Sequence, residues 1–264
     1  MKNSGIQYFA LITGASRGIG ASFAAELAEM GYHLILTARD EPLLSRIKDE
    51  IQKDHPNCRI FIKKADLTKE EDRKSVVHLA YEEDLPVNVL INNAGFGRIG
   101  RFDKISREEY TDMMQLNMMA PVEFTYDLLP LIKIQKPAYI LNVSSTAAFF
   151  PMPGFNIYAA TKTFLYNHSL ALREEMKSEK INVSCLCPGP TSTGFFDHPD
   201  MKGFYEKNKM IASNPQKVAK SGLTGMFKNK PVVIPGVANK FQVYSSAILP
   251  SSLKARMAKM VVGS

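Results

Sequence analysis

Three side chains suited to acid–base chemistry and hydrogen bonding, Ser145, Tyr158 and Lys162, lie within a stretch of eighteen residues. Tyr158 and Lys162 are four residues apart in a segment with helical periodicity, so they share one helix face. A free phenol has a pKa of about 10, and a nearby cation lowers that pKa toward neutrality. Ser145 follows an apolar run that predicts a buried strand, and its hydroxyl can hold a carbonyl oxygen beside the phenol. This spacing predicts a Ser–Tyr–Lys acid–base site.

Each of these features also has a purely structural interpretation. A tyrosine four residues before a lysine is common on ordinary helices, where the tyrosine packs and the lysine is solvated, and the pair alone favours that interpretation. Asn117 lies in an apolar helical segment, Met113–Ala120, where a polar side chain is locally unfavourable. It either bonds within the core or marks a kink that holds a water molecule. The remaining motifs of the sequence decide between the catalytic and the structural interpretation.

The composition is that of an ordinary globular protein. The chain has 264 residues, 45% hydrophobic and 22% charged, which suits one domain spanning residues 1–264. No apolar run reaches transmembrane length, and the N-terminus predicts a first strand instead of a signal peptide, so we expect a cytoplasmic protein. Cys58, Cys185 and Cys187 predict no disulfide framework and no metal site, and Cys185 and Cys187, which alternate along an expected strand, predict packed apolar groups.

The formal net charge of +7 is compatible with anionic ligands, membrane surfaces or nucleic acid. Nucleic-acid binders carry dense clusters of Lys and Arg with interleaved aromatic residues, and no stretch of the chain has that pattern. We therefore expect no nucleic-acid partner.

Short apolar runs alternate with helical patterns along the chain. This alternation predicts a doubly wound, Rossmann-type α/β fold, a parallel sheet of about seven strands with helices on both faces. The expected strands are Tyr8–Thr13, His33–Thr37, Arg59–Lys63, Val87–Asn92, Tyr139–Val143, Asn182–Cys187 and Val232–Ile234. The expected helices are near 18–30, 42–54, 69–84, 106–133, 157–177 and 215–227.

A glycine-rich turn joins the first strand to the first helix. Gly14, Gly18 and Gly20 have the spacing GxxxGxG. Glycines at this place permit a tight turn and let the backbone approach a pyrophosphate, which the N-terminus of the helix attracts. Glycines alone also simply make turns, but the position between strand and helix at the start of a βαβ series predicts a dinucleotide site.

The end of the second strand indicates the cofactor. NAD-binding sites place an acidic residue there for the ribose 2′-hydroxyl, whereas here the end of the strand is Thr37-Ala38, followed by Arg39. Arg17, in the glycine turn, supplies a second cation, and two guanidinium groups suit a 2′-phosphate. Asp40 either takes the hydroxyl instead or caps the next helix. We favour NADP over NAD.

Polar residues follow the third and fourth strands at the carboxyl edge of the sheet, where open α/β folds bind ligands. Asp66-Leu67-Thr68 follows the third strand and Asn92-Asn93-Ala94-Gly95 the fourth. Asp66 is also a candidate cap of the next helix, with Thr68 competing for that position.

Six ordered motifs resemble those of the short-chain dehydrogenase/reductase family between Tyr8 and Ile234: TGASRGIG, ADLT, NNAG, Asn117, Ser145 with YAATK, and Pro188-Gly189-Pro190-Thr191-Ser192-Thr193. The TGxxxGxG spacing matches the shorter oxidoreductase branch. The resemblance implies a catalytic tetrad of Asn117, Ser145, Tyr158 and Lys162. The cofactor-binding residues that it implies are Gly14, Ser16, Arg17, Gly18, Ile19, Gly20, Arg39, Asp66, Leu67, Asn92, Ala94, Gly95, Tyr158, Lys162, Pro188, Gly189, Thr191 and Thr193.

The C-terminus departs from the resembled acyl-carrier reductases, which end in a strand used for tetramer packing. Residues 237–264 instead predict a helical extension, with Leu253, Met257, Met260 and Val261 at helical spacing among Lys254, Arg256 and Lys259. We favour a helix packed on its own domain or on a partner subunit over a membrane-surface helix. A homodimer or homotetramer is expected, although this ending does not support the usual tetramer.

The substrate is predicted from an aromatic segment at residues 191–213. Glycines flank Phe195, Phe196, Phe204 and Tyr205 there, which suits a lid that closes over a substrate. The opposite wall is expected from Phe149, Phe150, Met152 and Phe155, with Phe96 nearby. The alternative is that these aromatics pack in the core or at a subunit contact. We predict an NADPH-dependent reductase of hydrophobic ketones or aldehydes. The alternative is an NAD(P)-binding regulatory or scaffold protein without turnover.

Overall fold

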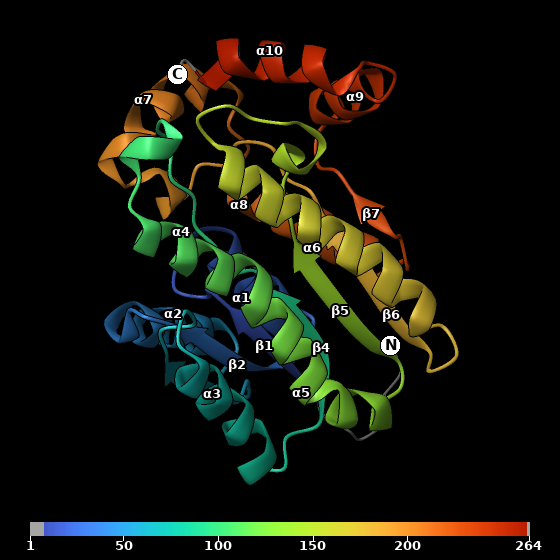
Figure 1. Cartoon of the computed structure of the whole chain (residues 1–264). Helices are drawn as coiled ribbons and strands as arrows, with labels where there is room; N and C mark the ends of the chain where they lie inside the picture. Colours follow the sequence, from blue (N-terminus) through green and yellow to red (C-terminus); the bar gives the residue numbers. More distant parts are fainter. Residues whose placement is uncertain (1–7, 263–264) are drawn as a thin grey trace.

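The computed structural model describes residues 8–262, and its centre is a parallel sheet (Figure 1). Within this range the sheet has seven strands in the order β3-β2-β1-β4-β5-β6-β7. The strands are β1 (Phe9–Thr13), β2 (His33–Ala38), β3 (Ile60–Lys64), β4 (Val87–Asn92), β5 (Ala138–Val143), β6 (Ile181–Leu186) and β7 (Val232–Val233). All neighbouring pairs are parallel. The order reverses direction at β1 and β4, as a doubly wound fold requires.

Helices cover both faces of the sheet, which confirms the predicted Rossmann-type architecture (Figure 1). One face carries α1 (Gly18–Glu29), α2 (Glu41–Asp54) and α8 (Pro215–Phe227). The other carries α3 (Glu70–Glu82), α5 (Ala120–Ile134) and α6 (Asn156–Glu175). Strand side chains alternate between the two layers. In β1, Ala10 and Ile12 pack under α1, whereas Phe9 and Leu11 pack toward α3 and α5.

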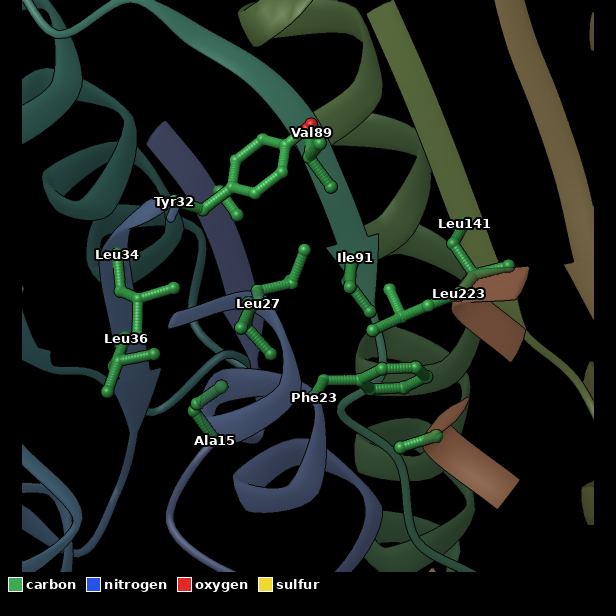
Figure 2. Packing of buried hydrophobic residues seen from close by; sticks show 14 of the residues in the cluster. Ala15, Phe23, Leu27, Tyr32, Leu34, Leu36, Val89, Ile91, Leu141 and Leu223 are labelled. Carbon is green, nitrogen blue, oxygen red and sulfur yellow. The ribbon is translucent and has the colours of Figure 1, made fainter. Parts of the chain in front are cut away.

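The first of these cores is shown in Figure 2, where Phe23 and Leu27 of α1 lie over Leu34, Val89 and Ile91 of the sheet. All five side chains are fully buried. Near-continuous burial along the central strands explains why the sequence shows apolar runs instead of strict alternation. This layer fixes α1, and with it the glycine turn at its N-terminus.

The strand predictions agree with the structure to within one or two residues. The expected helix at 106–133 is instead α4 (Arg107–Met114), a π-helical turn at Gln115–Met119 and α5. Asn117 lies within this π-helical turn, and its amide bonds a neighbouring loop, as in the first of its two predicted roles.

Three more helices gather beyond the carboxyl edge of the sheet (Figure 1, top). They are α7 (Pro199–Asn208), α9 (Val237–Ser246) and α10 (Ser251–Val262). The sequence predicted helical structure in the C-terminal extension but missed α7 inside residues 191–213. Val261 lies in α10, and its side chain is outside the described set. Among the helices described, none is long and apolar enough to cross a membrane.

Candidate functional site

A cavity of about 1630 Å³ lies at the carboxyl edge of the sheet and is walled by segments far apart in the sequence. One end is the glycine turn before α1. The other end is formed by residues 191–213 and by one face each of α9 and α10. Ser145, Tyr158 and Lys162 line the cavity between the two ends. The open α/β fold therefore places its ligand space where the topology predicts it.

The predicted acid–base residues meet on α6 and the loop before it. Tyr158 and Lys162 lie on the buried face of α6, and Ser145 caps a 3₁₀ turn at Thr146–Phe149 by accepting from the amide of Ala147 at 3.1 Å. The Lys162 ammonium donates to the carbonyl oxygen of Val143 at 2.9 Å. Its Nζ lies 5.7 Å from the centre of the Tyr158 ring. The end of β5 thus fixes the lysine that faces the phenol.

Burial controls the ionisation of this pair. Desolvation raises the pKa of Tyr158 to about 12, although a hydrogen bond with Ser145 acts to lower it. Desolvation also lowers the pKa of Lys162 to about 8. In this structure burial of the phenol outweighs the influences that lower its pKa, so the pKa of Tyr158 does not move toward neutrality as the sequence predicted. Tyr158 is therefore a protonated phenol at neutral pH, poised to donate.

Asn117 has a different position from the other three predicted catalytic residues. It is buried and does not line the cavity. Its amide donates to Phe96 O at 2.9 Å and to Thr161 Oγ1 at 3.1 Å, and its Oδ1 accepts from Phe96 N at 3.1 Å. These bonds tie the loop after β4 to α6. Asn117 therefore positions the Phe96 wall and the helix that carries Tyr158.

The glycine turn has room for a ligand backbone but not for side chains. A Cβ on Gly20 would clash with the carbonyl oxygen of Gly14, and Gly14 itself has φ of +66°. Asn93 holds this turn by donating to Thr13 O at 2.8 Å. No described side chain caps the N-terminus of α1, so its first amides face the cavity without a protein partner. This fits the pyrophosphate of a dinucleotide.

Charged residues surround the turn. Arg17 lies between two carboxylates, 3.6 Å from Asp40 Oδ2 and 3.2 Å from Asp197 Oδ2. Asp40 caps α2 by accepting from Leu43 N at 3.1 Å, which confirms one of its two predicted roles. Arg39 is exposed, lines the cavity and forms no ion pair with any residue between 8 and 262. It is the uncompensated cation at the end of β2.

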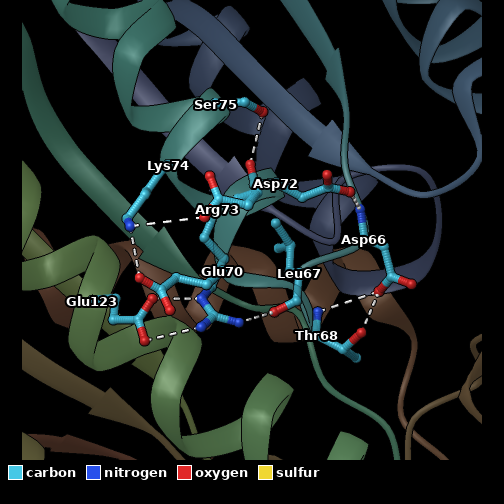
Figure 3. A network of polar contacts seen from close by, with 10 residues as sticks. Asp66, Leu67, Thr68, Glu70, Asp72, Arg73, Lys74, Ser75 and Glu123 are labelled. Carbon is cyan, nitrogen blue, oxygen red and sulfur yellow. Dashed lines mark hydrogen bonds and ion pairs between the residues drawn. The ribbon is translucent and has the colours of Figure 1, made fainter.

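Asp66 and Leu67 line the cavity as predicted and are held by a polar network (Figure 3). Asp66 Oδ1 accepts from the Thr68 hydroxyl at 2.9 Å. Beneath them, buried Arg73 donates to Leu67 O at 3.0 Å and binds both carboxylate oxygens of Glu123 at 2.6 and 2.9 Å. Asp66 does not cap α3, whose N-cap is Lys69. The network fixes the loop after β3 against α5.

Asn92 is a correction to the predicted cofactor set. It is buried and lies outside the cavity lining, because its Nδ2 donates to Asn142 Oδ1 at 2.8 Å inside the sheet. The neighbouring Asn93 reaches the cavity instead. The other predicted cofactor residues all line it: Gly14, Ser16, Arg17, Gly18, Ile19, Gly20, Arg39, Asp66, Leu67, Ala94, Gly95, Tyr158, Lys162, Pro188, Gly189, Thr191 and Thr193.

The aromatic segment packs against the phenol. Phe195 lies 5.5 Å from the ring centre of Tyr158, and Phe155 stacks on the same tyrosine at 4.3 Å. Phe196 and Phe204 also line the cavity. From the expected opposite wall, Phe96, Phe150, Met152 and Phe155 line it.

Phe149 and Tyr205 differ from their expected positions. Phe149 packs on Tyr166 at 4.9 Å in a separate core cluster, because its 3₁₀ turn directs it away from the cavity. Tyr205 packs on Phe196 at 5.1 Å and supports the aromatic wall from behind. Cys185 and Cys187 are buried free thiols 3.7 Å apart in that same separate cluster.

The sequence interpretation missed a polar wall. Arg98 Nε binds Glu109 Oε1 at 2.7 Å at the cavity rim. Polar residues of α9 also face the cavity: Asn239, Gln242, Ser245 and Ser246. Their intervals of three, three and one residues were the available signal, since such intervals keep side chains on one helix face. Within residues 8–262 no group of three His, Cys, Asp or Glu side chains is placed to hold a metal.

The motifs, the fold and the site agree with one family model, described as short chain dehydrogenase, which matches residues 8–200. The chain belongs to the short-chain dehydrogenase/reductase family. It is therefore an oxidoreductase that interconverts a carbonyl and an alcohol with NAD(P). A relative from Bacillus subtilis, the uncharacterized oxidoreductase DltE, is 34% identical over 186 residues, covering 70% of this chain and 71% of the relative.

Two solved structures are similar over 91% of the chain at 28% identity. One is a short-chain dehydrogenase from Sphingobium yanoikuyae in complex with NADPH, covered to 93% with a TM-score of 0.80. The other is the bulky-bulky ketone specific alcohol dehydrogenase from Comamonas testosteroni, covered to 91% with a TM-score of 0.76.

Proposed function

We propose that this protein is an NADPH-dependent reductase of bulky hydrophobic ketones or aldehydes. The observation that carries the proposal is the aromatic wall beside Tyr158, formed by Phe155 and Phe195, which both contact its ring. Such walls offer apolar area and few hydrogen bonds, so they favour bulky apolar carbonyl compounds over sugars and hydroxy acids. The similar ketone-specific enzyme from Comamonas testosteroni supports this substrate class.

Each of the predicted catalytic residues has a separate role in this proposal. Tyr158 donates its proton to the carbonyl oxygen of the substrate, and Ser145 holds that oxygen in place. Lys162 supplies positive charge close to the phenol, which stabilises the phenolate that remains. Asn117 keeps the Phe96 loop and α6 in register. When bound, NADPH supplies the hydride that the carbonyl carbon accepts.

Cofactor choice rests on Arg39 and Arg17. Both line the cavity beside the end of β2, where a 2′-phosphate would lie. Asp40 uses one carboxylate oxygen as a helix cap and has Arg17 near the other, which leaves it less suited to a ribose hydroxyl. Arg39 has no compensating carboxylate within the described residues, so an additional phosphate would neutralise it. NADPH is therefore favoured over NADH.

We further propose that residues 191–213 form a lid. The two ends of this segment are joined, since Ser192 N donates to Ser213 O at 3.0 Å and Ser213 N to Pro190 O at 2.8 Å. Between these ends, the segment contacts the rest of the cavity through an apolar cluster and through the Arg17–Asp197 ion pair; its members in the cluster are Phe195, Phe196, Met201, Phe204 and Tyr205. Exposed pairs of this kind contribute about 0–1 kcal/mol, so breaking this ion pair costs little free energy.

The expected homodimer or homotetramer stays a prediction.

A panel of carbonyl compounds followed by loss of NADPH absorbance tests the proposal. We expect turnover that rises with substrate hydrophobicity and disappears in Tyr158→Phe. A regulatory or scaffold protein would bind NADPH without turnover of any compound, and that result would contradict the proposed activity. Preference for small polar carbonyl compounds would contradict the substrate class alone.

A further inference from the structure

The C-terminal segment carries an uneven charge. Residues 207–264 contain ten lysines and arginines and no aspartate or glutamate. All 26 acidic residues of the chain lie before them, alongside the 23 other cations. The net charge of +7 is therefore the sum of a strongly cationic C-terminal segment and a slightly anionic remainder of the chain. Such asymmetry within one chain indicates an anionic partner for the cationic part.

Helix α9 is amphipathic in an unusual sense, because its polar face lines the cavity and its apolar face points to solvent. The outward residues Val237, Phe241, Tyr244 and Ile248 are 66–87% exposed. The first three repeat at intervals of four and three residues and form one stripe along the helix, and Ile248 follows two residues beyond the end of α9. A stripe of this kind on a helix that already packs on its other side requires a partner.

Helix α10 continues the apolar surface. Leu253, Met257 and Met260 repeat the spacing and are 42–76% exposed. Arg256 and Lys259 are exposed on the same helix. In Figure 1, α9 and α10 lie together at the end of the molecule beyond the carboxyl edge of the sheet. We define the exposed stripes of α9 and α10 as the terminal surface.

A basic groove of about 600 Å³ borders the terminal surface. Four exposed lysines from α8, from the loop before β7 and from α9 line it: Lys217, Lys220, Lys230 and Lys240. Ser221, Thr224 and Tyr244 also line it, together with the apolar residues Val232, Val233 and Ile234, and no carboxylate of the described residues contributes. Lysines and hydroxyls converging in this way suit a phosphate group. Tyr244 belongs both to the groove and to the α9 stripe, which makes the two features contiguous.

We propose that the terminal surface docks on an anionic membrane, with the basic groove receiving a phospholipid headgroup. Exposed apolar residues beside exposed cations are the composition of helices that lie in a membrane interface. A second copy of the chain is disfavoured as the occupant, because it would bring the cations of this surface and groove against their own copies: Lys217, Lys220, Lys230, Lys240, Arg256 and Lys259. The cavity walls formed by α9 and α10 would then stand on the bilayer, next to a reservoir of apolar compounds.

Co-sedimentation of the full chain with lipid vesicles tests the proposal without any turnover, so it is independent of the proposed substrate class. Vesicles of phosphatidylcholine alone are compared with vesicles that contain about one third phosphatidylglycerol. We expect binding to the anionic vesicles that weakens with added salt. Absence of binding to the anionic vesicles overturns the proposal.

The apolar contribution is isolated by a matched pair of double variants. Phe241→Gln with Ile248→Gln should weaken vesicle binding about tenfold or more, because both side chains would enter the interface. Tyr126→Gln with Ile134→Gln removes similarly exposed apolar residues of α5 and should leave vesicle binding unchanged. Equal vesicle binding by the two variants overturns the proposal. Light scattering tests the alternative occupant. A wild-type dimer that dissociates only in the Phe241→Gln with Ile248→Gln variant would also overturn the proposal, since a second copy would then cover the surface.

The charge contribution is isolated in the same way. Lys217→Gln with Lys220→Gln should weaken binding to the anionic vesicles and flatten its salt dependence. Lys53→Gln with Lys104→Gln removes two exposed lysines outside the groove and should change neither. Equal loss of vesicle binding in both double variants would show that net charge alone acts, and would overturn the role of the groove.

Discussion

The ammonium of Lys162 lies 5.7 Å from the ring centre of Tyr158 and donates to the carbonyl oxygen of Val143 at 2.9 Å. The lysine is thus anchored to the end of β5 while it faces the catalytic phenol. Burial lowers the pKa of Lys162 to about 8 and raises the pKa of Tyr158 to about 12. Of the two groups, only the lysine changes charge near physiological pH.

This relationship predicts the pH profile of carbonyl reduction. Below pH 8 Lys162 is cationic and stabilises developing phenolate charge, whereas above that pH it is neutral. Because its pKa is about 8, we expect kcat/KM to be level below that pH and to fall above it. Lys162→Ala should lower kcat/KM throughout and lose the falling limb. If Lys162→Ala keeps the same falling limb as the wild type, another group titrates and the assignment fails.

A second prediction concerns the cofactor. Arg39→Asp should raise the KM for NADPH about tenfold to a hundredfold, because a charge-assisted contact contributes about 1.5–3 kcal/mol. The KM for NADH should change little, since NADH lacks the 2′-phosphate. Lys53→Asp makes the same charge change outside the cavity and serves as the control. A wild-type enzyme that prefers NADH would show that Asp40 governs the site instead.

The buried ion pair between Arg73 and Glu123 gives a third prediction. Arg73 is almost fully buried, and Glu123 is 26% exposed. Arg73→Met leaves the carboxylate without its partner and should lower the free energy of unfolding by about 2–4 kcal/mol, somewhat below the range for fully buried pairs. It should also raise the KM for NADPH, since Leu67 loses its support. Urea denaturation and cofactor kinetics measure the two effects.

The double variant Arg73→Met with Glu123→Leu is the control for this pair. It removes both charges and should regain most of the lost stability, because an apolar replacement of a buried pair is often neutral. A double variant as unstable as Arg73→Met would show that packing of the Arg73 side chain is what matters.

Local patterns predicted much of this molecule. Glycines at a strand–helix turn and apolar runs of strand length depend on neighbours in sequence, so the sheet and the glycine turn could be predicted. The sequence could not predict whether Asn92 or Asn93 reaches the cavity, because the alternation of side chains along β4 and the hydrogen bond from Asn92 to Asn142 decide it. The same limit applies to the pKa of Tyr158. Its burial arises from Phe155 and Phe195, which come from separate segments.

The C-terminal extension shows a second limit. Helical spacing was visible in α10, but the sequence does not say which face of a helix meets the protein. The structure places the polar face of α9 in the cavity and leaves Phe241 and Ile248 exposed. The ordinary rule that apolar faces turn inward therefore predicts the wrong orientation here.

The last prediction concerns the lid and uses two neighbouring aromatic residues. Phe195 lines the cavity beside Tyr158, whereas Tyr205 supports Phe196 from outside the cavity. Phe195→Ala should lower kcat/KM for bulky ketones about tenfold, through a higher KM, because an aromatic side chain contributes about 1.5–3 kcal/mol of apolar contact at most. Small ketones, which do not reach this wall, should be affected much less.

Tyr205→Ala is the matched control for that prediction. It removes an aromatic residue from the same segment and should lower stability while sparing the preference for bulky substrates. Thermal unfolding of both variants separates the two effects. Equal loss of kcat/KM for bulky and small ketones in Phe195→Ala would mean that this residue supports the fold around Tyr158 and does not select the substrate. The lid would then have no role in specificity.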